Sequence, residues 1–192
     1  MLIRQNTYVA LKILNGYHTD LVNRGRVWEP EALKNISVPP SNPHCLQLAS
    51  SFTFPGKGSA GEHLCMVTQL LGGDVNSLRK QYGRVFSLPL AKRILLHLLR
   101  GISHAHSRGV IHTDIKLDNI FYDTQLSTDD LDALLASDPP RRHPPEASQD
   151  GTVQAAVTQP LPIPSSEDAL QRRFVLADFG SCMCSTMFIR LS

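Results

Sequence analysis

The sequence is poor in the features that mark several large classes of protein. Only four of its 192 residues are cysteines, and their positions (45, 65, 182 and 184) fit neither a C-x-x-C metal site nor a disulfide framework. No apolar run approaches the roughly 18 residues that a membrane helix needs, and the first residues lack the apolar region of a signal peptide. The net charge is only +2, so nothing indicates binding to nucleic acid or to an anionic membrane. We therefore expect a soluble, intracellular chain with reduced thiols.

The apolar residues that are present suffice for one core, because they make up 42% of the chain. Alternating and clustered apolar residues predict strands at 8–14, 46–54, 62–71 and 174–178. Apolar residues at steps of three and four predict helices at 19–36, 88–107 and 127–137. Residues 138–166 hold seven of the 13 prolines, which indicates a disordered spacer.

One stretch, residues 110–121, carries polar side chains in a pattern suited to phosphoryl transfer. An apolar strand end leads into a polar loop that holds Asp114, Lys116 and Asn119. A carboxylate can accept a proton from a hydroxyl, an ammonium can neutralise a migrating phosphoryl group, and an amide oxygen can bind a divalent cation. The loop is therefore a candidate catalytic site.

Two further motifs flank this loop. The sequence V-A-L-K at 9–12 precedes it and D-F-G at 178–180 follows it, each beside an apolar strand. Together with H-T-D-I-K at 112–116, they resemble the lysine strand, the D-F-G element and the catalytic loop of the eukaryotic protein kinases. Threonine at position 113, where most kinases carry arginine, resembles the SR-protein kinases and their fungal relatives.

The resemblance implies an α+β, protein-kinase-like fold of two lobes that is incomplete in this chain. Residues 1–71 would form a partial β-sheet small lobe and 72–137 the start of a helical large lobe. The spacer would follow at 138–166, and residues 167–192 would hold the D-F-G strand and an aberrant tail. Kinase domains of this kind have about 250 residues or more. We therefore expect a kinase truncated at both ends, with reduced or no activity.

The resemblance also assigns roles to residues. Asp114 and Lys116 would be catalytic, and Asn119 and Asp178 would bind Mg²⁺. His112 would be structural and would pack toward the D-F-G element. The residues expected to bind or enclose ATP are Ala10, Lys12, Glu29, Thr68, Gln69, Leu71 and Phe121.

Glu29 is the expected partner of Lys12, which would grip the phosphates, and Glu31 is a rival on another face of the helix. Pro30 predicts a kink or a helix start at this point. Ala10 and Phe121 would enclose the adenine. Thr68 would be the gatekeeper, and residues 69–71 the hinge.

These roles imply transfer of the γ-phosphoryl group of ATP to serine or threonine of a protein, with Arg/Ser-rich proteins as one substrate class. Thr113 indicates that no phosphorylated activation segment binds at its position. We expect a monomer in the cytoplasm, the nucleus or both. Two alternatives remain open. One is a non-catalytic, kinase-derived binding module, and the other is a small-molecule phosphotransferase, whose loop is not expected to carry Lys116.

Overall fold

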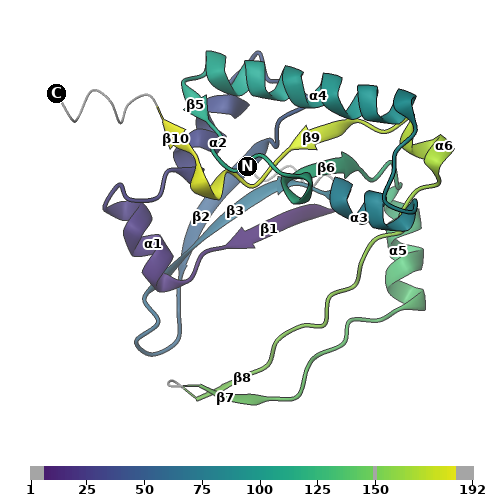
Figure 1. The fold of residues 1–192 in the computed structure, drawn as a ribbon. Helices are drawn as coiled ribbons and strands as arrows, with labels where there is room; N and C mark the ends of the chain where they lie inside the picture. Colours follow the sequence, from purple (N-terminus) through teal and green to yellow (C-terminus); the bar gives the residue numbers. More distant parts are fainter. Residues whose placement is uncertain (1–6, 149–150, 185–192) are drawn as a thin grey trace.

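The computed structural model describes residues 7–148 and 151–184, which form two three-stranded sheets and two short two-stranded ribbons with helices packed around them (Figure 1). This mixture of helices and antiparallel strands confirms the α+β prediction. The expected aberrant tail lies, from residue 185 onward, outside the described residues.

The first sheet contains β1 (Val9–Ile13), β2 (Leu48–Pro55) and β3 (Glu62–Gln69), with β3 in the centre. Both neighbours pair with β3 in antiparallel register, and Lys12 stands opposite Met66. The predicted hairpin between β2 and β3 is confirmed. The single strand predicted at 62–71 is two strands, because the chain turns at Leu70.

Two helices replace the single helix predicted at 19–36. They are α1 (Gly16–Asn23) and α2 (Glu29–Ser37). Gly25 follows α1 with φ 66°, a left-handed conformation that ends helices, and its N–H donates to the Val22 carbonyl. Pro30 lies in the first turn of α2, where its missing N–H costs little. The prediction of one continuous helix was therefore wrong, and the alternative of a helix start near Pro30 is confirmed.

The second sheet contains β4 (Leu71–Asp74), β6 (Ile120–Asp123) and β9 (Phe174–Leu176), with β6 in the centre. Helix α3 (Val75–Gln81) follows β4, and its N-cap Asp74 accepts a hydrogen bond from the Ser77 N–H. The remaining helices are α4 (Leu88–Ser107), α5 (Thr128–Ser137) and α6 (Ser166–Ala169). None of the helices within 7–148 and 151–184 is long and apolar enough to cross a membrane.

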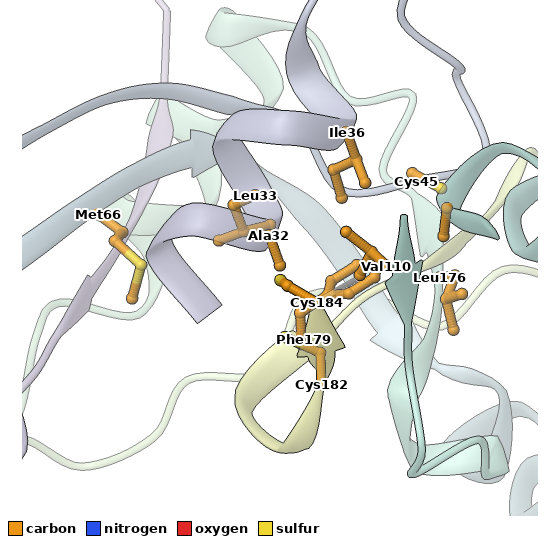
Figure 2. Close-up of a cluster of buried hydrophobic side chains, with 11 residues drawn as sticks. Ala32, Leu33, Ile36, Cys45, Met66, Val110, Leu176, Phe179, Cys182 and Cys184 are labelled. Carbon is orange, nitrogen blue, oxygen red and sulfur yellow. The ribbon is translucent and has the colours of Figure 1, made fainter. Parts of the chain in front are cut away.

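Helix α4 packs against β9 with the predicted stripe. Leu90, Ile94 and Ala105 are buried, and Leu98 and Ile102 pack against the same cores. One of these cores joins α2 to the D-F-G segment (Figure 2). Its buried members are Ala32, Leu33, Ile36, Cys45, Met66, Ala105, Val110, Leu176, Phe179, Cys182 and Cys184. Side chains from the first and the second half of the chain therefore pack together in this core, which includes residues on both sides of Asp178.

The proline-rich segment contains a ribbon where the sequence indicates a disordered spacer. Strands β7 (Glu146–Ser148) and β8 (Gly151–Val153) pair in antiparallel register, and a bridge joins Arg142 to Ala156. Pro144 and Pro145 separate the bridge from the strands, because proline has no N–H to contribute to a ladder. Figure 1 shows β7 and β8 projecting away from the two larger sheets.

Candidate active site

Lys12, Glu29 and Asp178 come from three separate elements and meet through their charged groups. Lys12 Nζ donates to Glu29 Oε1 at 2.7 Å and to Asp178 Oδ1 at 2.8 Å. Burial alone would lower the pKa of Lys12, but the carboxylates of Glu29 and Asp178 outweigh it and raise that pKa. Burial likewise opposes ionisation of Asp178, and the Lys12 ammonium overcomes it and lowers the Asp178 pKa. Lys12 and Asp178 are therefore both charged at neutral pH.

The start of α2 decides which glutamate reaches Lys12. Glu29 is the first residue of α2 and is buried, whereas Glu31 is exposed. Residues two apart on a helix face different directions. The structure therefore brings Glu29 to Lys12 and leaves the rival Glu31 on the surface.

A tight turn presents Asp178 to this cluster. Asp178 has φ 56° and ψ 69°, a left-handed conformation that aspartate adopts more readily than most residues. His112 Nε2 lies 2.8 Å from the Ala177 carbonyl, and its ring contacts the Phe179 ring with centroids 4.8 Å apart. The next residues, Phe179–Ser181, form one turn of 3-10 helix. His112 thus packs against the D-F-G turn and supports it.

The loop between β-strand residue Ile111 and Ile120 holds a second cluster, centred on Asp114. Its Oδ2 accepts from Lys116 Nζ at 2.6 Å and from Asn119 Nδ2 at 2.9 Å. The hydrogen bond from Lys116 is the main reason that the pKa of Asp114 is lowered, and the same contact raises the pKa of Lys116. Asp114 is therefore held as a carboxylate. Asn119 Nδ2 also donates to the Asp114 carbonyl at 2.9 Å, which fixes the orientation of the amide.

A cavity of about 450 Å³ lies between the two sheets; it is lined by the whole of the first cluster and by Asn119 of the second. Nine predicted residues line it: Ala10, Lys12, Glu29, Thr68, Gln69, Leu71, Asn119, Phe121 and Asp178. Asp114 and Lys116 are not part of the lining. Asp114 is linked to the lining residue Asn119 by a hydrogen bond, and Lys116 is paired with Asp114. Lining residues that were not predicted include Leu33, Leu46, Met66 and Asp118. Met66 could have been found, because it lies two residues before Thr68 and so on the same face of β3.

Strand β4, which follows the predicted hinge, makes a close contact that explains its two glycines. A Cβ added at Gly72 would lie 2.4 Å from Tyr122 Cε2, and one at Gly73 would lie 2.9 Å from the Tyr122 hydroxyl. Tyr122 is buried on β6, directly across from β4. Glycine is thus required for β4 to approach the ring.

Asn119 and Asp178 have the chemistry of a magnesium site. Because Asn119 Nδ2 is directed to Asp114, the amide oxygen is left for a cation, and Asp178 supplies a carboxylate to the same cavity. Mg²⁺ prefers oxygen ligands and takes few of them from protein, the rest coming from water and phosphates. Among the residues that the structure describes, no group of three or more His, Cys, Asp or Glu side chains could hold a metal. The carboxylate of Asp178 and the amide oxygen of Asn119 fit the donor set of Mg²⁺.

Three features surround one cavity between the two sheets: a paired lysine and glutamate, a D-F-G turn and an Asp-x-Lys-x-x-Asn loop. Together they define a protein kinase fold. The family model described as "Protein kinase domain" matches residues 1–133, and the chain belongs to this family.

The curated proteins that this chain resembles include the following three kinases. Serine/threonine-protein kinase SKY1 of Saccharomyces cerevisiae is 36% identical over 124 residues, which cover 60% of this chain and 16% of SKY1. Serine/threonine-protein kinase SRPK of Physarum polycephalum is 34% identical over 95 residues, covering 48% of this chain and 22% of the relative. SRSF protein kinase 3 of Mus musculus is 32% identical over 126 residues, covering 62% of this chain and 21% of the relative. The chain thus spans about a fifth of the length of these relatives.

Proposed function

We propose that the chain carries the nucleotide-binding and catalytic-loop machinery of an SR-protein-kinase-like serine/threonine kinase. The reaction is transfer of the γ-phosphoryl group of ATP to a serine or threonine hydroxyl of a protein. The observation that carries the proposal is the position of Lys12 between Glu29 and Asp178, at a cavity that Asn119 links to Asp114. Phosphoryl transfer depends mainly on positioning and electrostatics, and these residues supply both.

Nucleotide binding would use the cavity between the sheets. Ala10 and Phe121 would provide apolar surface for the adenine, and Thr68 and the backbone of residues 69–71, which line the same cavity, would face its polar edge. Lys12 would contact the phosphates, and Glu29 holds its ammonium in place. Asn119 and Asp178 would hold Mg²⁺, which when bound neutralises charge on the phosphates.

Catalysis would use Asp114 as the acceptor for the substrate hydroxyl. A carboxylate in this position orients the hydroxyl and takes its proton, which is typically worth about 10² to 10⁴ in rate. The lowered pKa of Asp114 keeps it ionised, and Lys116, 2.6 Å away, places a positive charge beside it. Lys116 is also the residue that favours a protein kinase over a small-molecule phosphotransferase.

The substrate class proposed is Arg/Ser-rich protein. The support is the similarity to relatives named SRPK and SRSF protein kinase 3, together with threonine at position 113. We propose a cytoplasmic or nuclear monomer. The support for this location is that the four cysteines, all within the described ranges, are free and buried, as is usual for proteins of a reducing compartment.

The first test is a thermal melt of the purified chain with and without Mg²⁺-ATP. Saturation at a hundred times the dissociation constant stabilises a fold by about 2.7 kcal/mol, which corresponds to several degrees of melting temperature. We expect this shift in the unmodified chain and in Asp114→Asn. We expect it to vanish in Lys12→Ala and in Asp178→Ala. A shift that both of these variants retain would contradict the nucleotide site.

The second test is phosphoryl transfer to an Arg-Ser peptide, compared with an aminoglycoside. Because the chain spans only part of its relatives, any transfer should be weak; the label should fall on serine of the peptide and should be lost in Asp114→Asn, although this variant still binds nucleotide. Labelling of the aminoglycoside alone would instead favour the small-molecule phosphotransferase. No nucleotide shift in a cooperatively folded chain would favour the binding module.

A further inference from the structure

Thr113 has a backbone conformation that its side chain disfavours. Its φ is 64°, in the left-handed region, where a β-branched residue is a true outlier. Within 7–148 and 151–184, three other non-glycine residues have positive φ, and none of them is β-branched: Arg84, Gln125 and Asp178. A strained conformation persists only where surrounding contacts hold it. The contacts of Thr113 therefore indicate what the strain achieves.

The Thr113 hydroxyl donates to the Ser181 carbonyl at 2.6 Å. The two residues lie 68 positions apart, at matching ends of paired strands. Thr113 follows β5 (Val110–Ile111) by two residues, and Ser181 precedes β10 (Met183–Cys184) by two. The strands pair in antiparallel register. The side-chain hydrogen bond therefore continues the β5–β10 ladder beyond its last main-chain pair.

His112 and Thr113 together hold both ends of the turn that carries Asp178. His112 Nε2 contacts the carbonyl of Ala177, one residue before Asp178, and Thr113 Oγ1 contacts the carbonyl of Ser181, three residues after it. Between these two anchors, Asp178 is left-handed. Figure 2 shows the Phe179 and Cys182 side chains directed into the core beside this turn. The Asp178 backbone is thus fixed from two sides by neighbouring residues of one loop.

We propose that Thr113 is a positioning residue, whose hydroxyl holds the turn after Asp178 so that its carboxylate stays directed at the metal position. The inference rests on the proposed function and adds a residue to it. A neutral hydroxyl bonded to a main-chain carbonyl makes this tie without any phosphate or ionised group. The two heavy atoms on the threonine Cβ restrict χ1, which limits the hydroxyl to few directions. Serine in the same place would keep the bond with a less restricted donor.

The test compares three substitutions at this position. Thr113→Val removes only the hydroxyl, because it keeps the shape and the disfavoured φ. Thr113→Ser keeps the hydroxyl. Thr113→Gly removes both the hydroxyl and the strain, so it remains informative if the valine variant does not fold.

The first readout is amide hydrogen exchange of residues 177–184 in the absence of nucleotide. We expect about tenfold faster exchange in Thr113→Val and Thr113→Gly, with Thr113→Ser within about twofold of the unmodified chain. Exchange at residues 90–105 of α4 should stay unchanged and serves as the internal control. Equal exchange at 177–184 in the unmodified chain, the valine variant and the glycine variant would overturn the proposal.

The second readout is the Mg²⁺ concentration at half of the ATP-induced melting shift. We expect it to rise about three- to tenfold in Thr113→Val and to return with Thr113→Ser. An unchanged Mg²⁺ concentration alongside faster exchange would also overturn the proposal, since the tie would then be structural only. If ATP and Mg²⁺ do not shift the melting temperature of the unmodified chain, the proposed function is contradicted, and so is the metal-positioning role of Thr113. The exchange comparison separates that failure from a loss of the Thr113 tie.

Discussion

Lys12 Nζ lies 2.7 Å from Glu29 Oε1, and the two partners differ sharply in their contact with water. The Glu29 side chain is 3% exposed, whereas that of Lys12 is 46% exposed. A charge that is buried without a partner costs more free energy than an exposed one. The pair therefore matters for stability mainly because Glu29 would otherwise be an uncompensated buried carboxylate.

Substitution of Lys12 should destabilise the fold through Glu29. We expect Lys12→Ala to lower the free energy of unfolding in urea by about 1 to 3 kcal/mol, the cost of an unpaired buried group. The double substitution Lys12→Ala with Glu29→Gln should recover part of this loss, because the remaining group is neutral. It should not recover the nucleotide-induced melting shift. Lys34→Ala, on the exposed face of α2, is the control and should stay within about 0.5 kcal/mol. A double variant no more stable than the single one would contradict this account.

Gly101 should not tolerate alanine, although it lies inside helix α4. Alanine normally stabilises a helix interior by about 1 kcal/mol relative to glycine. At this position a Cβ would lie 2.5 Å from the His44 carbonyl oxygen, which is backbone and cannot rotate away. We expect Gly101→Ala to lower the free energy of unfolding by about 1 to 3 kcal/mol. Ser103→Ala, exposed on the same helix, should be neutral or slightly stabilising. An equally stable Gly101→Ala chain would show that α4 and residue 44 can separate freely.

The parts of the site that are local follow from the sequence alone. Asp114, Lys116 and Asn119 lie close together in the chain, and their contacts follow from one loop and one 3-10 turn. Lys12 is placed by its strand, because alternation decides which face of β1 it occupies. The positions of these side chains could be predicted because each depends on spacing within a short segment.

The contacts between distant segments could not be predicted in this way. The hydrogen bond from Thr113 to Ser181 joins two loops, and the bond from the Tyr8 hydroxyl to Asp132 likewise ties the start of β1 to α5. No local pattern encodes either pairing. The break near Gly25 was also missed, because apolar residues keep helical spacing across it, and only the positive φ of the glycine marks the end of α1.

Native thiols should react slowly with a disulfide reagent. All four cysteines are buried, and burial raises the pKa of Cys45 and of Cys182 to about 12. Only the thiolate is nucleophilic. Burial keeps the reagent away from these thiols and, through the raised pKa, keeps their ionised fraction low. We expect reaction about 100-fold slower in the folded chain than in urea. Ser51→Cys, on the exposed face of β2, should add one fast-reacting thiol. A fast thiol in the unmodified folded chain would contradict the burial of the four cysteines.

Stability should fall as the solution is acidified, because two stacked histidines hold the backbone of β9. The centroids of the His44 and His97 rings lie 4.2 Å apart. His97 Nδ1 accepts a hydrogen bond from the Phe174 N–H at 3.1 Å. Burial and the neighbouring positive groups lower the pKa of His97 to about 4. The unfolded chain titrates this group near 6.5, so between these values it binds more protons than the folded chain. The contribution of neutral His97 to the free energy of unfolding is complete above about pH 6.5. It is lost toward about pH 4, at up to about 1.4 kcal/mol per pH unit for one proton.

Urea unfolding from about pH 7.5 to about pH 4.5 measures this slope. His97→Asn keeps an acceptor for the Phe174 N–H without titrating, and it should reduce the slope by about one proton. Because the asparagine cannot gain a proton in either state, any slope that remains in this variant belongs to other groups. Equal slopes in the two chains would show that His97 has the same pKa in the folded and the unfolded chain, and would contradict this account.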